Sequence, residues 1–275
     1  MRPKPPRKDR LPFRGKSPEK PQGKPQGNPR EKRSRRGGET WLYGLHAVQA
    51  ALANPRRRLG RAVLTARAAE LIGTELLSRV RVEPADAEAI TRMLPPGAVH
   101  QGAALETHPL AALDLDTVLN EADTGKRRVV LVLDQLSDPH NVGAILRTAA
   151  AFAVTAVVVQ DRNAPPQSGA LAKAASGALE FVPYIEVVNI TRVLDQLAER
   201  GFWRIALAGD GAQPLSNVIP EGDVALVLGS EGDGIRRLVR EHCEASAFIP
   251  IAPQMESLNV SNAAAIALYE LRRGQ

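Results

Sequence analysis

Residues 129–152 read VVLVLDQLSDPHNVGAILRTAAAF, and the pattern of hydrophobicity changes partway along this stretch. The first six residues, which end at Asp134, are a continuous apolar run of the kind that forms a strand buried on both faces. From Asn141 onward, apolar residues recur at helical spacing, which predicts an amphipathic helix over 141–152. A buried strand, a loop and a helix in succession are typical of an α/β fold with a parallel sheet.

The same alternation continues to the C-terminus. We expect further strands at 155–160, 202–209, 223–229 and 247–251, an extended segment at 181–187, and helices at 168–177, 190–201, 234–243 and 259–273. This series predicts a mostly parallel sheet with helices on both faces. Ligands of such sheets bind at the carboxyl ends of the strands, so the loops 135–141, 208–214, 229–233 and 252–258 are the places to search for a site.

A shorter series of elements precedes this sheet and predicts a small α/β domain. We expect strands at 61–66, 81–86 and 100–108 and helices at 68–80 and 87–94, with residues 109–126 as a connector that carries at least one helical turn. The segment 41–54 is expected to open with a short aromatic stretch and to continue as a helix with Leu45, Val48, Ala51 and Leu52 on one face. The helix at 68–80 is expected to continue through Gly73.

The N-terminal 38 residues differ from the rest in composition. They hold 14 Lys or Arg against three acids, with eight Pro and five Gly, whereas the remaining 237 residues hold 22 basic residues against 27 acids. We expect a disordered basic tail. Such a tail is either a non-specific RNA-binding arm with salt-sensitive affinity or a solubilising leader without a specific partner.

The overall composition excludes several classes of protein. Hydrophobic residues make up 44% of the 275 residues, yet no run of eighteen apolar residues predicts a membrane span. The basic N-terminus lacks the apolar stretch of a secretory signal. A single cysteine, Cys243, excludes an internal disulfide and any cysteine-built metal site, and we expect it to be a small core or interface residue. We expect a cytoplasmic location.

The first of the predicted ligand-binding loops leads into the helix at 141–152. Asn141 stands where a helix N-cap belongs, and Gly143 permits the close approach of another backbone. Arg147 follows about two turns later, near the same helical face. In the alternative interpretation, Asp138-Pro139 is an ordinary turn, Asn141 only caps the helix, and Arg147 is merely solvated.

The second loop is GSEGDG at 229–234, between a strand and a helix. Its glycines allow a ligand to reach backbone N–H groups, and Glu231 places a carboxylate in the middle. The pattern is neither the dinucleotide-binding GxGxxG nor a P-loop. A generic glycine-rich turn is the alternative interpretation.

The third loop is QMESLNVSN at 254–262. Ser257, Asn259, Ser261 and Asn262 crowd the start of the predicted C-terminal helix. One polar side chain is enough to cap a helix, so the others are available for a ligand.

These three segments, in this order and at this spacing, resemble the signature motifs of the SpoU (TrmH) family of RNA ribose 2′-O-methyltransferases. The resemblance covers about 127–275. LYGLHAVQAAL at 42–52 and GAVHQG at 97–102 resemble a small ribosomal-protein-L30-like substrate-binding domain, as in the bacterial 23S ribosomal RNA guanosine-2′-O-methyltransferase subgroup. Gln254 and Glu256 depart from the small or neutral residues common in the third motif, but Ser257-Leu258-Asn259 is intact.

The resemblance implies a domain organisation and a cofactor. It implies an L30-like substrate-binding domain at 39–108 and, at 127–275, a methyltransferase domain whose sheet contains a deep trefoil knot. The basic tail at 1–38 and the linker at 109–126 come from the composition, and the tail has no counterpart in the compact family members. S-adenosylmethionine is the implied methyl donor, and no metal is implied. The residues implied to hold the donor are Gly229, Ile249 and Leu258, with Gly209, Gly232, Pro250 and Met255 as neighbours.

The resemblance also implies catalytic residues and a partner. The implied catalytic residues are Arg147, Asn141, Glu231, Ser257 and Asn259. The family acts as a homodimer with a composite active site, so the helix at 259–273 is expected to take part in the interface.

The chemistry fits these residue types. A ribose 2′-hydroxyl is a poor nucleophile until its proton is withdrawn. An arginine normally keeps its charge. Arg147 therefore either stabilises the developing alkoxide, or takes the proton in a dry pocket beside a backbone phosphate, while Glu231 and Asn141 orient Arg147 or the ribose.

Three alternatives remain at the level of sequence. Transfer RNA is an alternative substrate, although family members that act on it commonly lack the N-terminal domain. A non-catalytic RNA-binding protein that keeps the fold is a second alternative, which intact Arg147, Glu231 and Asn259 disfavour. A nicotinamide-dependent enzyme is the third, and it lacks the GxGxxG fingerprint.

Overall fold

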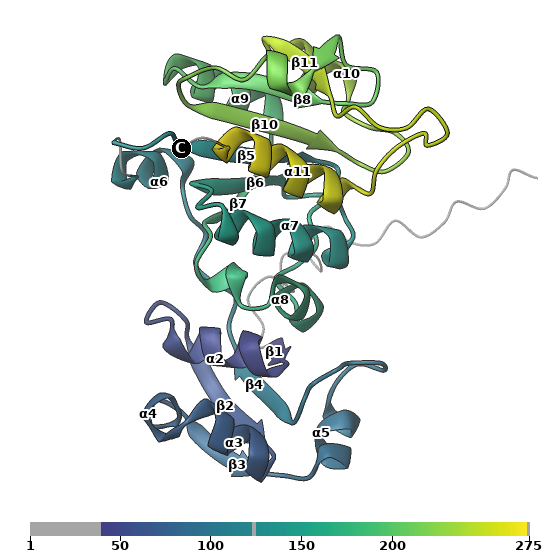
Figure 1. Ribbon diagram of the computed structural model, residues 1–275. Helices are drawn as coiled ribbons and strands as arrows, with labels where there is room; N and C mark the ends of the chain where they lie inside the picture. The colour runs from purple at the N-terminus through teal and green to yellow at the C-terminus, as the bar shows by residue number, and fades with distance from the viewer. Residues whose placement is uncertain (1–39, 123–124, 274–275) are drawn as a thin grey trace, which may run out of the picture. The chain divides into compact units, whose positions relative to one another are not determined.

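A computed structural model describes residues 40–122 and 125–273 of the chain (Figure 1). The predicted tail at 1–38 lies outside the described residues. The described residues form a four-stranded sheet from the N-terminal third and a seven-stranded sheet from the remainder. The prediction of an α/β fold with a parallel C-terminal sheet is confirmed.

The larger sheet has the order β7-β6-β5-β10-β8-β11-β9, and each neighbouring pair is parallel. Its strands are β5 (Val129–Asp134), β6 (Ala156–Gln160), β7 (Tyr184–Val187), β8 (Trp203–Leu207), β9 (Gln213–Pro214), β10 (Val224–Gly229) and β11 (Ala245–Phe248). All six residues of β5 are buried, as the continuous apolar run predicts. The register pairs Val224 with Val129 and Gly229 with Asp134, so β5 and β10 end level with each other.

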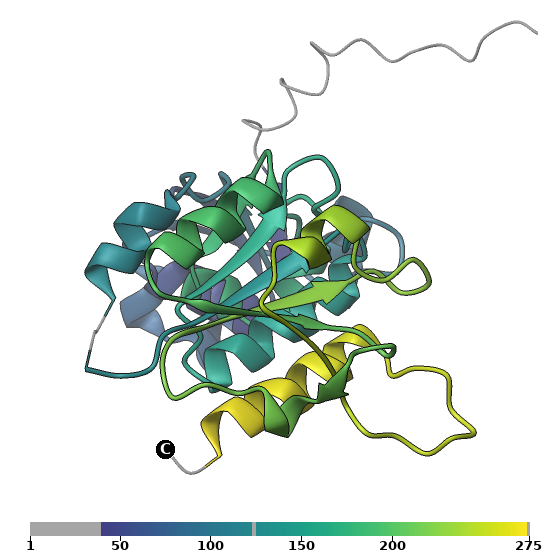
Figure 2. The same ribbon diagram turned by 90° about the horizontal axis from the view of Figure 1, so that it is seen from above.

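Helices cover both faces of this sheet because its strand residues alternate between two hydrophobic clusters. Val129, Leu131 and Leu133 pack with the helices α7 (Pro139–Ala151), α8 (Gly169–Ala175) and α11 (Val260–Arg272). Val130 and Val132 face the other way, toward α6 (Leu115–Glu121), α9 (Ile190–Glu199) and α10 (Arg237–Glu241). Figure 2 shows α9, in green, and α11, in yellow, on opposite sides of the sheet.

The start of α7 differs from the prediction. Asp138 is the N-cap, and its side chain accepts a hydrogen bond from the backbone N–H of His140 at 2.9 Å. Proline suits the first position of a helix, because the backbone N–H that it lacks would have no partner within the helix there and its fixed φ is close to the helical value. The helix therefore begins two residues earlier than expected. Asn141 therefore lies inside the first turn, and its side chain is available for other contacts.

The smaller sheet has the order β1-β4-β2-β3. Its elements are β1 (Thr40–Tyr43), α2 (Leu45–Ala53), β2 (Leu59–Leu64), α3 (Ala66–Ile72), α4 (Thr74–Leu77), β3 (Arg81–Pro84), α5 (Ala87–Met93) and β4 (Ala103–Thr107). The single helix expected at 68–80 is wrong. Gly73 has φ 87°, a left-handed value that ends α3 and allows α4 to start in a new direction.

Smaller corrections concern the last third of the chain. Helix α10 begins at Arg237 rather than at Gly234, because Ser230 and Gly234 exchange backbone hydrogen bonds and extend the preceding loop. Strand β11 lies at 245–248 rather than at 247–251, and the two-residue strand β9 was not expected. Two 3₁₀ turns, η1 (Ala178–Glu180) and η2 (Leu215–Asn217), complete the elements.

A buried ion pair connects the segment after α2 to the turn after α8. The Arg57 guanidinium binds both carboxylate oxygens of Glu180 and donates to the carbonyl of His108 at 2.9 Å. Asn54 donates to Glu180 at 2.8 Å. Both Arg57 and Glu180 are more than nine-tenths buried, so the loss of one partner would leave the other charge uncompensated.

None of the helices in the described ranges is long and apolar enough to cross a membrane.

Gly143 on α7 lies against α8, and the close approach of another backbone that a glycine permits is thus made by this helix. A Cβ atom built at Gly143 would lie 2.4 Å from the Cβ of Ala174 and 2.9 Å from the backbone nitrogen of Ala175. The small residue at this position therefore lets the two helices approach closely.

Gly143→Ala is expected to destabilise the protein. Overpacking costs about 1–3 kcal/mol, which outweighs the gain in helix propensity of about 1 kcal/mol at most. Urea unfolding measures the difference. Gly222→Ala is the control, since nothing lies within 4 Å of its added Cβ. Equal stability of the Gly143→Ala and Gly222→Ala proteins would show that α7 and α8 are not in tight contact.

Candidate functional site

The carboxyl ends of β8 and β10, together with the segment after β11, enclose a cavity of about 610 Å³. Its wall includes residues 207–210 after β8, residues 228–235 after β10, and Ile249, Ile251 and residues 256–258 after β11. Three of the four loops selected from the sequence therefore contribute to one cavity. This location is the usual ligand site of an open parallel sheet.

The loop after β10 is folded tightly on itself. Ser230 and Gly234 exchange backbone hydrogen bonds of 3.1 and 3.0 Å, and Gly232 and Gly234 have positive φ angles of 97° and 66°. A Cβ at Gly229 would lie 2.1 Å from the carbonyl carbon of Gly234. Only glycine fits there, and the loop can thus present Glu231 at its tip.

The Glu231 carboxylate is the meeting point of the three sequence motifs. Its Oε1 accepts hydrogen bonds from Asn141 Nδ2 at 3.2 Å and from Asn259 Nδ2 at 2.8 Å. Asn259 Nδ2 also donates to Asn141 Oδ1 at 3.0 Å. We call Asn141, Glu231 and Asn259 the Glu231 cluster. It joins the first turn of α7, the glycine-rich loop and the start of α11.

Asn259 has a second role as the N-cap of α11. Its Oδ1 accepts from the backbone N–H of Ser261 at 2.9 Å and from the Ser261 hydroxyl at 2.5 Å. The side chain therefore uses its oxygen to start the helix and its amide group to hold Glu231. Ser257, the other polar residue expected in the site, lines the cavity and is exposed.

Arg147 lies apart from this cluster. It is exposed on α7, and it does not line the cavity. Within residues 40–122 and 125–273, the structure gives its guanidinium no hydrogen bond or ion pair. Of the five residues expected to be catalytic, three are therefore joined by hydrogen bonds, Ser257 lies in the cavity wall, and Arg147 is separate.

The residues expected to hold the donor fall into two groups. Gly209, Gly229, Gly232, Ile249 and Leu258 line the cavity. Pro250 and Met255 do not line it; Pro250 faces a smaller hollow beside Ile266, and Met255 is exposed.

Sequence reasoning missed two arginine–aspartate pairs around the cavity. Asp134, at the end of β5, accepts three hydrogen bonds from Arg236. Arg240 binds both carboxylate oxygens of Asp210 at 2.9 and 2.8 Å, and these bonds hold the pKa of Asp210 below its ordinary value. The sequence feature that could have revealed these pairs is a charged residue directly after an apolar strand, or in the loop at the carboxyl end of such a strand.

The cavity wall carries an excess of negative charge. Asp210, Glu231, Asp233 and Glu256 are acidic, and Arg240 is the basic residue among them. Such a wall favours a ligand that carries positive charge, because unlike charges attract most strongly where water is partly excluded. Among the described residues there is no group of three or more His, Cys, Asp or Glu that could hold a metal ion.

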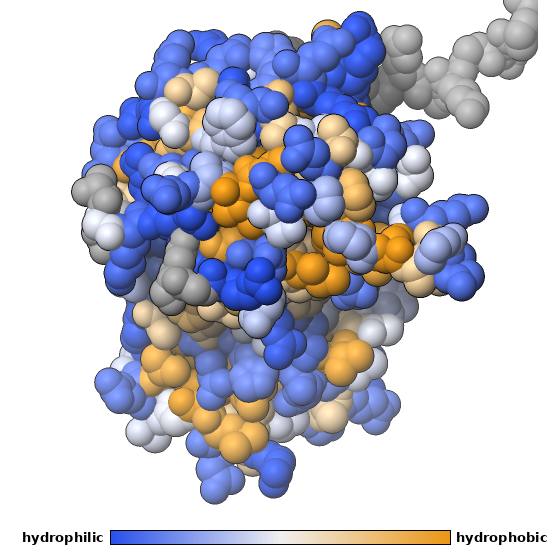
Figure 3. All heavy atoms as spheres, turned by 45° about the horizontal axis from the view of Figure 1, so that its top comes forward, coloured by the Kyte–Doolittle hydropathy of each residue, from blue (hydrophilic) through white to orange (hydrophobic). Residues whose placement is uncertain are grey.

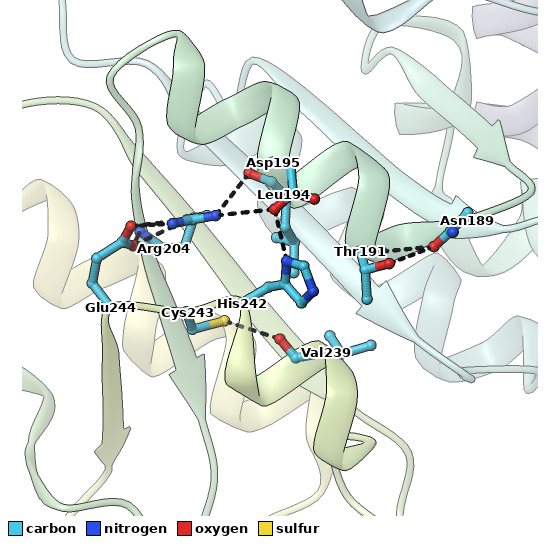
Figure 4. A network of polar contacts seen from close by, with 9 residues as sticks. All are labelled: Asn189, Thr191, Leu194, Asp195, Arg204, Val239, His242, Cys243 and Glu244. Atoms are coloured by element: carbon cyan, nitrogen blue, oxygen red, sulfur yellow. Dashed lines mark hydrogen bonds and ion pairs between the residues drawn. The ribbon is translucent and has the colours of Figure 1, made fainter.

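Cys243 lies outside the cavity, on the face of the sheet that α6, α9 and α10 cover. It lies beside a network of charged side chains (Figure 4). Its thiol donates to the carbonyl of Val239 at 3.5 Å. Nearby, Arg204 binds Glu244, and His242 lies 2.7 Å from Asp195. Burial raises the pKa of the Cys243 thiol to about 12, so the thiolate needed for nucleophilic chemistry is scarce at neutral pH.

Two family models match the chain. The SpoU rRNA Methylase family matches residues 128–269, and the RNA 2′-O ribose methyltransferase substrate-binding family matches residues 41–113. The first match contains the large parallel sheet and the Glu231 cluster, and the second contains the small sheet. The chain belongs to the SpoU rRNA methylase family.

Individual relatives agree with this membership. The chain is 39% identical over 238 residues to the 23S rRNA (guanosine-2′-O-)-methyltransferase RlmB of Ralstonia nicotianae, a match that covers 84% of this chain and 94% of the relative. It is 35% identical over 240 residues to the RlmB of Pseudomonas putida, with 84% and 95% covered.

Solved structures share the fold. The SpoU methyltransferase AviRb of Streptomyces viridochromogenes, in complex with AdoMet, matches with a TM-score of 0.72 at 22% identity, over 89% of this chain and 92% of that one. An AdoMet-bound rRNA methyltransferase of Sinorhizobium meliloti matches with a TM-score of 0.71 at 21% identity, over 90% of each chain.

The raised pKa of Cys243 predicts slow alkylation of the native protein. At pH 8 a thiol with a pKa near 12 forms roughly a thousandfold less thiolate than a free cysteine, so iodoacetamide is expected to modify the native chain that much more slowly than the urea-unfolded chain. Mass spectrometry over time measures both rates. Similar rates would contradict the burial of this thiol.

Proposed function

We propose that the chain transfers the methyl group of S-adenosylmethionine to the ribose 2′-hydroxyl of a guanosine in 23S ribosomal RNA. The observation that carries this proposal is the meeting of the three motif segments at Glu231, beside a cavity at the carboxyl ends of the strands. Relatives named as enzymes of this activity match 84% of the chain. The substrate-binding family model over 41–113 supports an RNA substrate.

The cavity suits S-adenosylmethionine in size, shape and charge. A volume of about 610 Å³ lies within the range of small-molecule sites. Glycines at 229, 232 and 234 line the cavity without side chains that would fill it, and the acidic wall suits the positive sulfonium and ammonium groups. We propose that Gly229, Ile249 and Leu258 line the donor site, with Gly209 and Gly232 beside them.

When bound, the donor supplies a methyl group that is already activated by its attachment to a sulfonium. The work left to the protein is to orient the ribose and to withdraw the 2′-hydroxyl proton or stabilise the alkoxide. In our proposal the Glu231 cluster and Ser257 position the ribose at the mouth of the cavity. Arg147 either stabilises the oxygen as negative charge develops or accepts its proton.

We further propose that the chain acts as a homodimer with a composite site. Ile266 and Tyr269 are three residues apart on α11 and are exposed by 43% and 58%, and Ile251 and Met255 before the helix are exposed as well. Apolar side chains extend across this face in Figure 3. An exposed apolar surface of this kind is typical of a protein contact. Because Arg147 does not line the cavity of its own chain, we propose that it completes the cavity of the partner.

The remaining parts of the proposal rest on the family resemblance. They are a trefoil knot in the C-terminal segment, a domain boundary near residues 109–126, and a cytoplasmic location, where ribosomal RNA is modified. In the structure, a Cβ at Gly209, after β8, would lie 3.9 Å from the carbonyl oxygen of Glu256, after β11, which is ordinary van der Waals contact. These two loops therefore pass side by side.

Mapping of 2′-O-methyl groups in total RNA, with and without the gene, tests the substrate. We expect one guanosine of 23S ribosomal RNA to lose its methyl group in the deletion strain and to regain it on complementation. Loss of a methyl group from transfer RNA instead would favour the alternative substrate. An unchanged map would contradict the proposed function.

Arg147→Ala is expected to abolish methyl transfer in vitro. Loss of a group that stabilises the reacting oxygen costs about 10²–10³ in kcat. Binding of S-adenosylmethionine, measured by calorimetry, is expected to be largely kept, because in our proposal Arg147 acts on the ribose oxygen and not on the donor. Arg192→Ala is the control, since Arg192 is exposed on α9 at the other face of the sheet. Near-normal turnover of Arg147→Ala would exclude both roles of Arg147.

A further inference from the structure

Two arginine–aspartate pairs of the same geometry fasten the central strands β5 and β10 at opposite ends. At the amino ends, the Asp223 carboxylate accepts three hydrogen bonds from Arg128. The donors are the backbone N–H of Arg128 at 2.7 Å, its Nε at 2.8 Å and a terminal guanidinium nitrogen at 2.5 Å. At the carboxyl ends, Asp134 accepts from the same three kinds of donor on Arg236, at 2.9, 2.9 and 2.6 Å. The first pair lies far from the cavity, and the second lies beside it.

The Asp134 carboxylate is the more completely enclosed of the two. Its side chain is 0% exposed, whereas that of Asp223 is 19% exposed. A carboxylate withdrawn from water is stable only when donors satisfy it, and Arg236 supplies three. The Arg236 side chain is 38% exposed, so the pair is open to solvent on the arginine side.

The Asp134–Arg236 pair fixes the C-terminal end of the glycine-rich loop, just before α10. The loop leaves β10 at Gly229, which is opposite Asp134 in the register, and Arg236, the N-cap of α10, lies two residues after the last residue of the loop, Gly234. Between these points, the Ser230–Gly234 backbone bonds close the loop on itself and place Glu231 at the tip. Both ends of the loop are therefore held against the last residue of β5.

The direction of Glu231 depends on this attachment. Its Oε1 must reach Asn141 and Asn259 together, at 3.2 and 2.8 Å. The Ser230–Gly234 bonds fix the shape of the loop, but the flanking glycines leave its direction relative to Asn141 and Asn259 free to vary. Fixing both ends of the loop reduces that freedom. Sheet hydrogen bonds hold the first end at Gly229, and the charge pair of Asp134 with Arg236 holds the second end.

We propose that Asp134 and Arg236 are positioning residues for methyl transfer, which act by holding the glycine-rich loop so that Glu231 joins Asn141 to Asn259. This inference rests on the proposed function. Asp134 is not expected to touch the reacting atoms, because it is fully buried and its carboxylate is occupied by Arg236. Arg236 is not expected to touch them because it does not line the cavity.

The test compares substitutions at the two pairs. Asp134→Asn and Arg236→Gln weaken the pair at the site, and Asp223→Asn weakens the matched pair at the other end of the same two strands. Arg236→Gln guards against a failure of Asp134→Asn to fold, because the side chain of Arg236 is partly exposed. For each full-length variant, the measurements are the melting temperature, the Kd for S-adenosylmethionine by calorimetry, and kcat on 23S ribosomal RNA.

We expect Asp134→Asn and Arg236→Gln to lower kcat by about 10- to 100-fold, the usual effect of a displaced supporting residue. The same loop lines the cavity, so the Kd for S-adenosylmethionine should rise by roughly three- to tenfold. Asp223→Asn should lose thermal stability and keep both kcat and Kd within about twofold of the unsubstituted chain. If Asp134→Asn and Arg236→Gln match Asp223→Asn in kcat and Kd, the pair is merely structural and the inference is wrong.

The inference can fail independently of the proposed function. If the unsubstituted chain transfers no methyl group to 23S ribosomal RNA, the proposed function is wrong, and the Kd for S-adenosylmethionine then tests only whether Asp134 and Arg236 hold the loop that lines the cavity. A combination with Glu231→Ala adds a second criterion. Since Asp134 acts through Glu231, Asp134→Asn should lower the residual kcat of Glu231→Ala by less than about twofold, whereas independent effects would multiply.

Discussion

One carboxylate oxygen, Oε1 of Glu231, accepts hydrogen bonds from two asparagine side chains that belong to different helices. Asn141 is 90 residues and Asn259 is 28 residues from Glu231 along the chain, and the two asparagines are themselves 118 residues apart. These residues meet because parallel strands place their carboxyl ends at one edge of the sheet. The site therefore exists only when the whole sheet has formed.

The rest of the architecture places a cavity beside this cluster. The cavity is walled by loops after β8, β10 and β11, and its acidic residues suit the cationic donor that we propose. The small sheet, matched by a substrate-binding family, is tied to the turn after α8 by the buried contacts of Arg57 and Asn54 with Glu180. Since α8 packs against Gly143 of α7, these contacts lead to the helix that carries Asn141 and Arg147.

The sequence was sufficient to predict the strand–helix alternation, because burial on both faces leaves a continuous apolar run at 129–134 and helices leave a period of about 3.6 residues. It was insufficient where backbone geometry decided the outcome. Helical periodicity at 68–80 concealed the break at Gly73, whose positive φ comes from the local turn. Asn141 resembled an N-cap, but Asp138-Pro139 supplied an earlier start to the helix.

The candidate site was predictable in its residue types and not in its contacts. The three motifs named Asn141, Glu231 and Asn259, yet their hydrogen bonds depend on loop conformation, which has no periodic signature. The Asp134–Arg236 pair was missed for the same reason: its members are 102 residues apart, and an aspartate after an apolar strand is ordinary on its own. Distances of this kind follow from the register of β5 with β10, which a single sequence does not specify.

We propose above that the cavity beside the Glu231 cluster holds the methyl donor. A crystal structure of the full chain with S-adenosylmethionine tests this proposal. We expect the donor in the cavity against Gly229, Ile249 and Leu258, with its methyl group directed toward Glu231 and Asn259. Density for the donor at any other place on the chain, with this cavity empty, would show that the proposed donor site is wrong.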